Sequence, residues 1–191
     1  MTFSALLDTC VLVPSVLRDL LLELGTGPAY RPVWSDRIEN ELRQTIVELR
    51  ARRGRDPQET QAYVTRLLHQ MNTALPDARA TVEPGSEETV SGLPDPDDNH
   101  VVAAAVAGRA DVVATFNLRD FPDDVLPGQL FSQSPDDFLL DLWGLYPALI
   151  DDAIEKILQR TGRRGPRWTR TELLDRLSRE QVPGFATLAA S

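Results

Sequence analysis

Four acidic residues stand at or near points where a short apolar run gives way to a turn or a helix: Asp8, Glu41, Asp98 and Asp120. In an α/β fold the ends of parallel strands meet in one crevice, so acids far apart in the sequence can gather there. Gathered carboxylates repel one another unless a cation neutralises them. A site of oxygen ligands suits Mg²⁺ or Mn²⁺, and metal-bound water can hydrolyse a phosphodiester.

Neighbouring acids leave two of these positions open. Asp95 and Asp97 are close enough in sequence to take the place of Asp98, and Asp98 could instead cap the helix that follows it. Glu39 competes with Glu41, because residues two apart on a helix face different directions. Glu41 lies beside the apolar stripe of its helix, so we expect it to point inward and Glu39 to face solvent.

Protein nucleophiles and soft metal ligands are scarce. One cysteine and two histidines exclude an internal disulfide and argue against a zinc site built from Cys and His. Cys10 follows Asp8 closely but has no evident histidine partner, so we interpret it as a small core residue. His100 follows the third acid at a helix start, where it could hydrogen-bond the site or pack in the interior.

The composition is that of a globular protein. The chain has 191 residues, of which 42% are hydrophobic, enough for one domain and a smaller extension. Its longest apolar run, Val101 to Ala107, is too short to cross a bilayer, and Asp8 interrupts the apolar N-terminus, so we expect no signal peptide. The lone cysteine fits a reducing compartment, and we expect a cytoplasmic protein.

The distribution of charge qualifies the net charge. A net charge of −9 opposes a polyanionic partner. Arginines nevertheless gather near residues 50–55, including Arg50, Arg52 and Arg53, and again over residues 160–170. Arginine can bind phosphate through two parallel hydrogen bonds, so each cluster is a candidate phosphate-binding surface. Each cluster also fits ordinary solvated helix ends.

The first two-thirds of the chain alternates between strand and helix patterns. Strands are expected over residues 3–7, 31–34 and 111–115, and helices over residues 14–25, 35–53, 56–74 and 100–107. Ser35 and Asp56 are expected N-caps, the latter followed by Pro57 at a first helical turn. This βαβ rhythm predicts a mostly parallel sheet covered by helices on both faces.

After Ser132 the pattern becomes helical only. One helix is expected to start at Ser134, a second to span Pro147 to Gln159, and a third to follow the capping-box pattern that begins at Thr169. We therefore predict two parts, an α/β domain over residues 1–132 and a helical extension over residues 133–191. The extension is expected to pack on the core or on a partner.

Four segments together resemble the PIN-domain nucleases. They are Leu6-Leu7-Asp8-Thr9, Ser35 followed by Glu41-Leu42, Asp95-Pro96-Asp97-Asp98-Asn99-His100 with the apolar run after it, and Val113-Ala114-Thr115-Phe116-Asn117-Leu118-Arg119-Asp120-Phe121-Pro122. They cover about residues 3 to 122, in order. The tail from Ser134 is similar to the helical C-terminal extension of some longer VapC-type toxins.

The resemblance implies a PIN-like three-layer α/β/α fold and assigns roles by position. Asp8, Glu41, Asp98 and Asp120 would be the catalytic acids and the ligands of Mg²⁺ or Mn²⁺. Thr9 and Thr115 would hold water or a carboxylate, and His100 would support the site. Asn117 stands where many relatives carry Asp, and an amide keeps an oxygen ligand but removes a charge.

The function implied is a metal-dependent endoribonuclease that is the toxin of a type II toxin–antitoxin pair. The expected partners are an RNA substrate, which Arg50, Arg52 and Arg53 would help to bind, an antitoxin protein and a second copy of the chain. A non-enzymatic binding or scaffolding module of the same fold is the alternative. The net charge of −9 and Asn117 favour that alternative.

Overall fold

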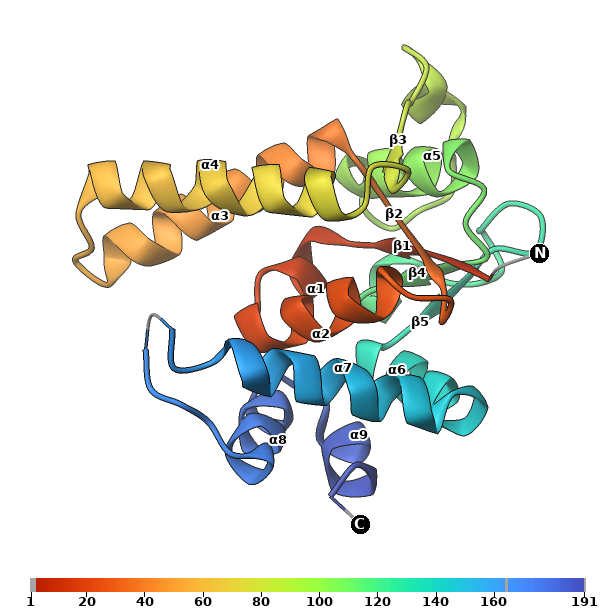
Figure 1. Ribbon diagram of the computed structural model, residues 1–191. Coiled ribbons are helices and arrows are strands. Elements are labelled where there is room, and N and C mark those ends of the chain that lie inside the picture. Colours follow the sequence, from red (N-terminus) through yellow and green to blue (C-terminus); the bar gives the residue numbers. More distant parts are fainter. Residues whose placement is uncertain (1–2, 164, 191) are drawn as a thin grey trace.

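A parallel β-sheet forms the centre of the molecule in a computed structural model that describes residues 3–163 and 165–190. Its strands lie in the order β3-β2-β1-β4-β5 and every neighbouring pair is parallel (Figure 1). They are β1 (Ser4–Leu7), β2 (Arg31–Ser35), β3 (Arg79–Ala80), β4 (Val112–Ala114) and β5 (Phe131–Gln133). The predicted α/β class and the three predicted strands are confirmed. The sequence does not predict the short edge strands β3 and β5.

Helices cover both faces of the sheet. They are α1 (Thr9–Leu12), α2 (Ser15–Gly25), α3 (Asp36–Arg52), α4 (Pro57–Ala74) and α5 (Asn99–Ala107). In Figure 1, α3, α4 and α5 lie on one side of the sheet, and α1 and α2 lie on the other. Three short 3-10 turns sit in the loops: η1 (Ser86–Thr89), η2 (Pro96–Asp98) and η3 (Leu118–Asp120). The three-layer α/β/α arrangement agrees with the prediction.

Side-chain caps start α3 and α4 where the sequence indicates. The Ser35 hydroxyl accepts the backbone N–H of Ile38 at 3.3 Å. The Asp56 carboxylate accepts the N–H of Glu59 at 2.8 Å, with Pro57 in the first turn. Each cap satisfies one of the N–H groups that a helix start leaves without a partner. The Ser35 cap sets where α3 leaves β2, and the Asp56 cap sets where the chain turns back into α4.

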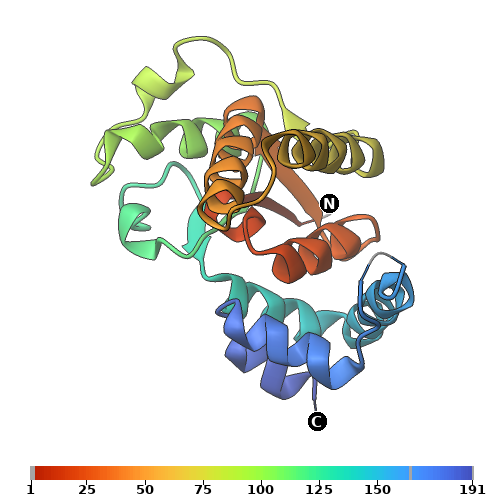
Figure 2. The ribbon, with the colours of Figure 1, turned by 90° about the vertical axis from the view of Figure 1, so that its left-hand side faces the viewer.

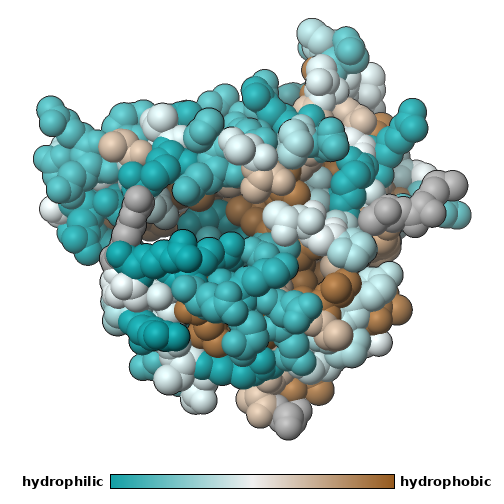
Figure 3. All heavy atoms as spheres, in the orientation of Figure 1, coloured by the Kyte–Doolittle hydropathy of each residue, from teal (hydrophilic) through white to brown (hydrophobic). Residues whose placement is uncertain are grey.

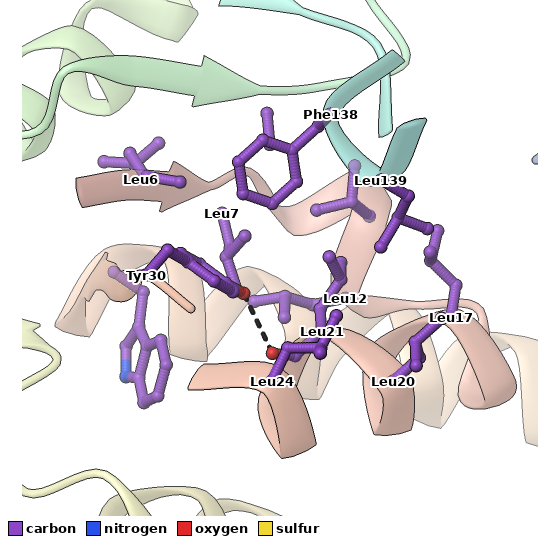
Figure 4. Close-up of a cluster of buried hydrophobic side chains, with 14 of the residues drawn as sticks. Leu6, Leu7, Leu12, Leu17, Leu20, Leu21, Leu24, Tyr30, Phe138 and Leu139 are labelled. Carbon is purple, nitrogen blue, oxygen red and sulfur yellow. Dashed lines mark hydrogen bonds between the residues drawn. The ribbon is translucent and has the colours of Figure 1, made fainter. Parts of the chain in front are cut away.

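The C-terminal helices share the core of the sheet domain. They are α6 (Pro135–Leu145), α7 (Pro147–Arg160), α8 (Arg170–Arg179) and α9 (Pro183–Leu188). Figure 4 shows Phe138 and Leu139 of α6 beside Leu6 and Leu7 of β1 and the leucines of α2. Phe138 also meets the Tyr30 ring edge-on, with centroids 5.0 Å apart. The predicted boundary between residues 132 and 133 therefore lies within one continuous hydrophobic cluster, and it stays a prediction.

Polar contacts tie the extension to α2. The Glu180 carboxylate accepts the N–H groups of Val16 and Leu17 at 3.0 and 2.8 Å, at the start of α2. The predicted capping box of Thr169 and Glu172 starts α8 and is confirmed, whereas α9 is not predicted from the sequence. No helix of residues 3–163 and 165–190 is both long and apolar enough for a membrane span.

The surface seen in Figure 3 is mostly hydrophilic, with apolar side chains gathered on the side where α6 meets α7. Leu145 is the most exposed large apolar side chain of the described residues, at 68%. Phe3, Phe131 and Leu145 line a surface cavity of about 470 Å³ there.

Candidate active site

The four predicted acids lie at the carboxyl ends of the strands and the loops beside them. Asp8 directly follows β1, and Asp120 ends η3, the turn after β4. Asp98 ends η2 immediately before α5, and Glu41 lies in the second turn of α3. Figure 2 views the molecule from the side on which the strands end, with α3 near the centre. Parallel strands thus bring acids from four chain segments to one edge of the sheet.

Asp8 is buried and held by two side-chain donors. The Thr115 hydroxyl donates to its Oδ2 atom at 2.7 Å, and the Cys10 thiol donates to the same atom at 3.1 Å. Thr115 therefore holds a carboxylate, which is one of the two roles predicted for it. The Asp8 side chain is only 7% exposed, so its orientation is fixed by these neighbours.

Cys10 packs against the hydrophobic core, as interpreted from the sequence, but it is only partly buried and it also contacts the site. Its sulfur also accepts the backbone N–H of Phe116 at 3.2 Å. Burial raises the pKa of the Cys10 thiol to about 12, and the charge of Asp8 adds to the rise. The thiol is thus a protonated donor at neutral pH, not a nucleophile. Only its position two residues after Asp8 hints at this role in the sequence.

Glu41 is surrounded by donors. The Thr9 hydroxyl donates to Oε2 at 2.8 Å, His100 Nε2 lies 2.9 Å from Oε1, and Arg37 Nε lies 3.4 Å from Oε1. Burial alone would raise the pKa of Glu41, but the hydrogen bonds from His100 and Thr9, together with Arg37, bring it below its ordinary value. Glu41 is therefore held ionised. The spacing of four residues between Arg37 and Glu41 was the available sequence signal for Arg37.

His100 is 4% exposed, so it is both a buried residue and a neighbour of the acids. Its Nε2 atom contacts Glu41, whereas its buried Nδ1 atom has no hydrogen-bond partner among the described residues. The two roles left open by the sequence are thus combined in one side chain. His100 positions Glu41 beside the start of α5.

Asp98 and Asp120 differ from the other two acids, because neither carboxylate accepts a hydrogen bond within the described residues. Burial raises the pKa of Asp98 to about 6, and the charges of Asp8, Asp120 and Asp95 add to the rise. Asp98 is therefore within electrostatic reach of both Asp8 and Asp120. Like charges held together in this way are typical of sites that bind a cation.

The alternatives to Asp98 are placed differently. Asp95 and Asp97 are exposed, and the Asp95 carboxylate accepts the N–H of Asp97 at 2.9 Å within their own turn. Asp98 is half-buried, and its side chain makes no capping hydrogen bond to α5. The geometry therefore favours Asp98 as the acid of this segment that faces Asp8 and Asp120.

Glu39 does not face solvent, so that expectation is wrong. Its side chain is buried and accepts hydrogen bonds from Trp34 Nε1 and Asn72 Nδ2, both at 2.9 Å. Asn72 belongs to α4, which packs on α3. The apolar stripe of α3 does not reveal that α4 covers the side of the helix that carries Glu39. Glu39 is a structural acid that joins β2, α3 and α4.

The side chains of the remaining predicted residues make no hydrogen bond or ion pair with the four carboxylates among the described residues, although the Asn117 carbonyl accepts the backbone N–H of Asp120 at 2.9 Å. Asn117 has an exposed side chain, and its backbone N–H donates to the Thr115 hydroxyl at 3.0 Å. Arg50 donates to Thr60 and lies over the Tyr63 ring. Two more of the predicted arginines, Arg52 and Arg53, end the same helix and are exposed; Arg52 is 3.7 Å from Glu48. RNA binding by these arginines stays a prediction.

The oxygen donors of the site are of the type that binds a divalent cation, but the distances between the acids are not those of a complete metal site. Asp98 and Asp120 are oxygen donors without partners, which suits Mg²⁺ or Mn²⁺. Among the described residues, however, no three His, Cys, Asp or Glu side chains converge closely enough to surround one ion. The acids therefore form a charged cluster rather than a finished coordination shell.

Sequence comparison places the chain in a family. The sequence model of the PIN domain matches residues 4–119, more than half of the chain, and the chain therefore belongs to the PIN domain family. A second model, the VapC50 C-terminal domain, matches residues 135–191. The family resemblance predicted from the four motifs is confirmed.

A relative described as "Putative ribonuclease VapC50" from Mycobacterium tuberculosis is 45% identical over 97 residues. The match covers 48% of this chain and 53% of the relative, so the chain spans about half of the length of that protein. No solved structure matches the chain significantly.

Proposed function

We propose that the protein is an endoribonuclease that uses Mg²⁺ or Mn²⁺ and acts as the toxin of a type II toxin–antitoxin pair. The observation that carries this proposal is the group formed by Asp8, Asp98 and Asp120, with Glu41 beside it. Membership of the PIN domain family and the likeness to a VapC50 protein support the choice of RNA as substrate.

Asp8, Glu41, Asp98 and Asp120 would hold the metal. When bound, the ion supplies an activated water and relieves the charge that develops on the phosphoryl oxygens. The other residues of the site keep the acids in place. Thr115 and Cys10 orient Asp8, while Thr9 and His100 orient Glu41. Asp98, with a pKa of about 6, exchanges a proton near neutral pH and is mostly ionised at pH 7.

The direct test is cleavage of structured single-stranded RNA by the full chain, with Mn²⁺ or with EDTA. We expect cleavage with Mn²⁺ only, and loss of cleavage in Asp8→Asn and Asp120→Asn. Asp152→Asn is the matched control, because Asp152 is an exposed acid of α7, far along the chain from the site. Equal cleavage in EDTA, or full activity of Asp8→Asn, would refute the proposal.

Protein partners follow from the same proposal. A VapC-type toxin is expected to bind an antitoxin, and an unpaired acid cluster attracts a cationic side chain of such a partner. Self-association to a homodimer is also expected for the family. Light scattering of the purified chain, alone and with the product of the neighbouring gene, would test both expectations.

A second candidate is a PIN-like binding module without catalysis. The spacing of the acids favours it, since no three acids of the described residues yet surround one point. The net charge of −9 and Asn117 agree with it. Millimolar Mn²⁺ should raise the melting temperature of a protein with a competent site by mass action, and should leave an inactive module unchanged.

A further inference from the structure

Arg37 is placed where an anionic substrate meets an anionic site. Among the described residues, it is the only Arg or Lys side chain that contacts any of Asp8, Glu41, Asp98 and Asp120. An RNA strand that approaches these carboxylates needs local positive charge to offset their repulsion. Arg37 supplies that charge from α3, one turn before Glu41.

The three nitrogens of the Arg37 guanidinium have three different partners. Nε lies 3.4 Å from the Glu41 carboxylate, and Nη2 donates to the backbone carbonyl of Asp97 at 3.3 Å. These two contacts join α3 to η2, the turn that carries Asp98. Nη1 contacts the Glu87 carboxylate at 2.6 Å. The first two partners belong to the walls of the site, so they fix the orientation of the guanidinium.

Glu87 is a different kind of partner. It lies on η1, and both side chains are well exposed, at 45% for Arg37 and 40% for Glu87. Exposed ion pairs are weak and are easily exchanged for another anion. A phosphate diester presents two oxygens to a guanidinium in much the same way as a carboxylate does. Glu87 thus occupies a position that suits a phosphate.

We propose that Arg37 binds an RNA phosphate next to the scissile bond, and that Glu87 holds this guanidinium until the RNA displaces it. The proposal rests on the proposed ribonuclease function and identifies a substrate contact for it. RNA entry exchanges an intramolecular carboxylate for a phosphate oxygen, with no net change in the ion pairs of Arg37. Arg37 therefore both binds substrate and secures the η2 turn.

The chain offers a matched control for each residue. Arg37 and Arg79 line one surface cavity of about 780 Å³ and are similarly exposed. Arg79, however, pairs with Asp36 and contacts none of the four acids. Glu88 follows Glu87 in η1, and its side chain has no partner among the described residues. Each control removes the same charge from the same neighbourhood without touching the proposed contact.

The experiment measures binding of a short fluorescent single-stranded RNA to the full chain, in EDTA so that no cleavage occurs, over a range of salt concentrations. We expect Arg37→Ala to weaken binding about tenfold and to reduce the slope of log K against log salt by about 0.7, the loss of one phosphate contact on a single strand. Arg79→Ala should change both quantities much less. Arg37→Lys should restore the slope but only part of the affinity, because the point charge remains and the planar fork does not.

Glu87→Gln should tighten binding severalfold more than Glu88→Gln, because it removes the competing carboxylate as well as a charge. Melting curves check that each variant is folded. The inference is overturned if Arg37→Ala and Arg79→Ala bind alike, if Glu87→Gln and Glu88→Gln bind alike, or if the unsubstituted chain binds no RNA at low salt. Failure of Mn²⁺-dependent cleavage by the unsubstituted chain would instead overturn the ribonuclease proposal.

Discussion

In the C-terminal extension, Asp136 and Glu180 each accept two backbone hydrogen bonds, at the starts of α9 and α2. At the sheet edge, the Asp98 and Asp120 carboxylates accept none from the described residues. The two regions therefore use the same type of side chain in opposite ways. In the extension a carboxylate completes the fold, whereas at the sheet edge it stands against other carboxylates.

The difference separates stability from function. A carboxylate that caps a helix satisfies N–H groups that would otherwise lack partners. A carboxylate beside like charges destabilises the free protein and is retained where a cation or a substrate will use it. The helical extension supports the α2 side of the sheet domain, and the sheet edge carries the acids that the proposed function assigns to catalysis.

Asp8→Asn is expected to have the largest effect on activity. A small effect would contradict the contrast between the acids of the sheet edge and those of the extension. We expect Mn²⁺-dependent RNA cleavage to fall by at least about 100-fold, on the order of what loss of support around a metal site causes. Stability in EDTA should be unchanged or slightly higher, because one charge that opposes Asp98 is removed. Cleavage rates and melting curves measure both. A strongly destabilised variant would show that Asp8 is a structural acid.

Asp136→Ala tests the other region. Its carboxylate accepts the N–H groups of Gly184 and Phe185 at 2.9 and 2.7 Å, so we expect unfolding free energy to fall by about 1–2 kcal/mol. RNA cleavage per folded molecule should not change. Denaturant unfolding measures the loss, and Asp152→Ala, at an exposed position of α7, should stay within about 0.5 kcal/mol of the unsubstituted chain.

The pH dependence of the metal-free protein sharpens the contrast. Because burial and neighbouring charges raise the pKa of Asp98 to about 6, this carboxyl group keeps its proton to higher pH in the folded chain than in the unfolded chain, and its contribution to stability falls between about pH 4 and 6. Stability should therefore fall as pH rises through this window. Solvent screening limits the effect on this half-buried group, so we expect a change of a few degrees in melting temperature.

Asp98→Asn should make the pH dependence between about pH 4 and 6 less steep, because residue 98 then has no proton to lose. Mn²⁺ should reverse the trend in the unsubstituted chain, since a cation favours the ionised acids. An unchanged pH profile in the variant would mean that Asp98 is not the acid whose raised pKa causes the pH dependence.

The parts of the fold that the sequence predicts are those with local signals. The apolar stripe of the helix and the Ser35 cap identify α3, and Asp56 with Pro57 identifies α4. The edge strands β3 and β5 have two and three residues, and each exists only through pairing with a distant strand. The strand β4 is as short as β5, but its three residues are apolar and buried, whereas β3 and β5 include polar, partly exposed residues and so have no apolar run that marks a strand.

The same limit applies to the candidate site. The four acids are predicted because each lies beside a recognisable strand end or helix start. Glu39 is misplaced because its partners Trp34 and Asn72 lie on other elements. The role of Cys10 is missed because it depends on Asp8 and on the Phe116 backbone, which reaches the thiol only in the folded chain. Tertiary contacts decide these roles.

Substitution of Cys10 is expected to have the smallest effect. The Cys10 thiol donates a hydrogen bond to the Asp8 carboxylate, whereas the Asp98 carboxylate has no such donor. Cys10→Ser keeps a donor, so we expect the Mn²⁺ affinity measured by thermal shift to stay within about threefold. Cys10→Ala removes the donor and should weaken that affinity by about tenfold. If both variants bind Mn²⁺ alike, Thr115 alone orients Asp8, and the thiol only fills space.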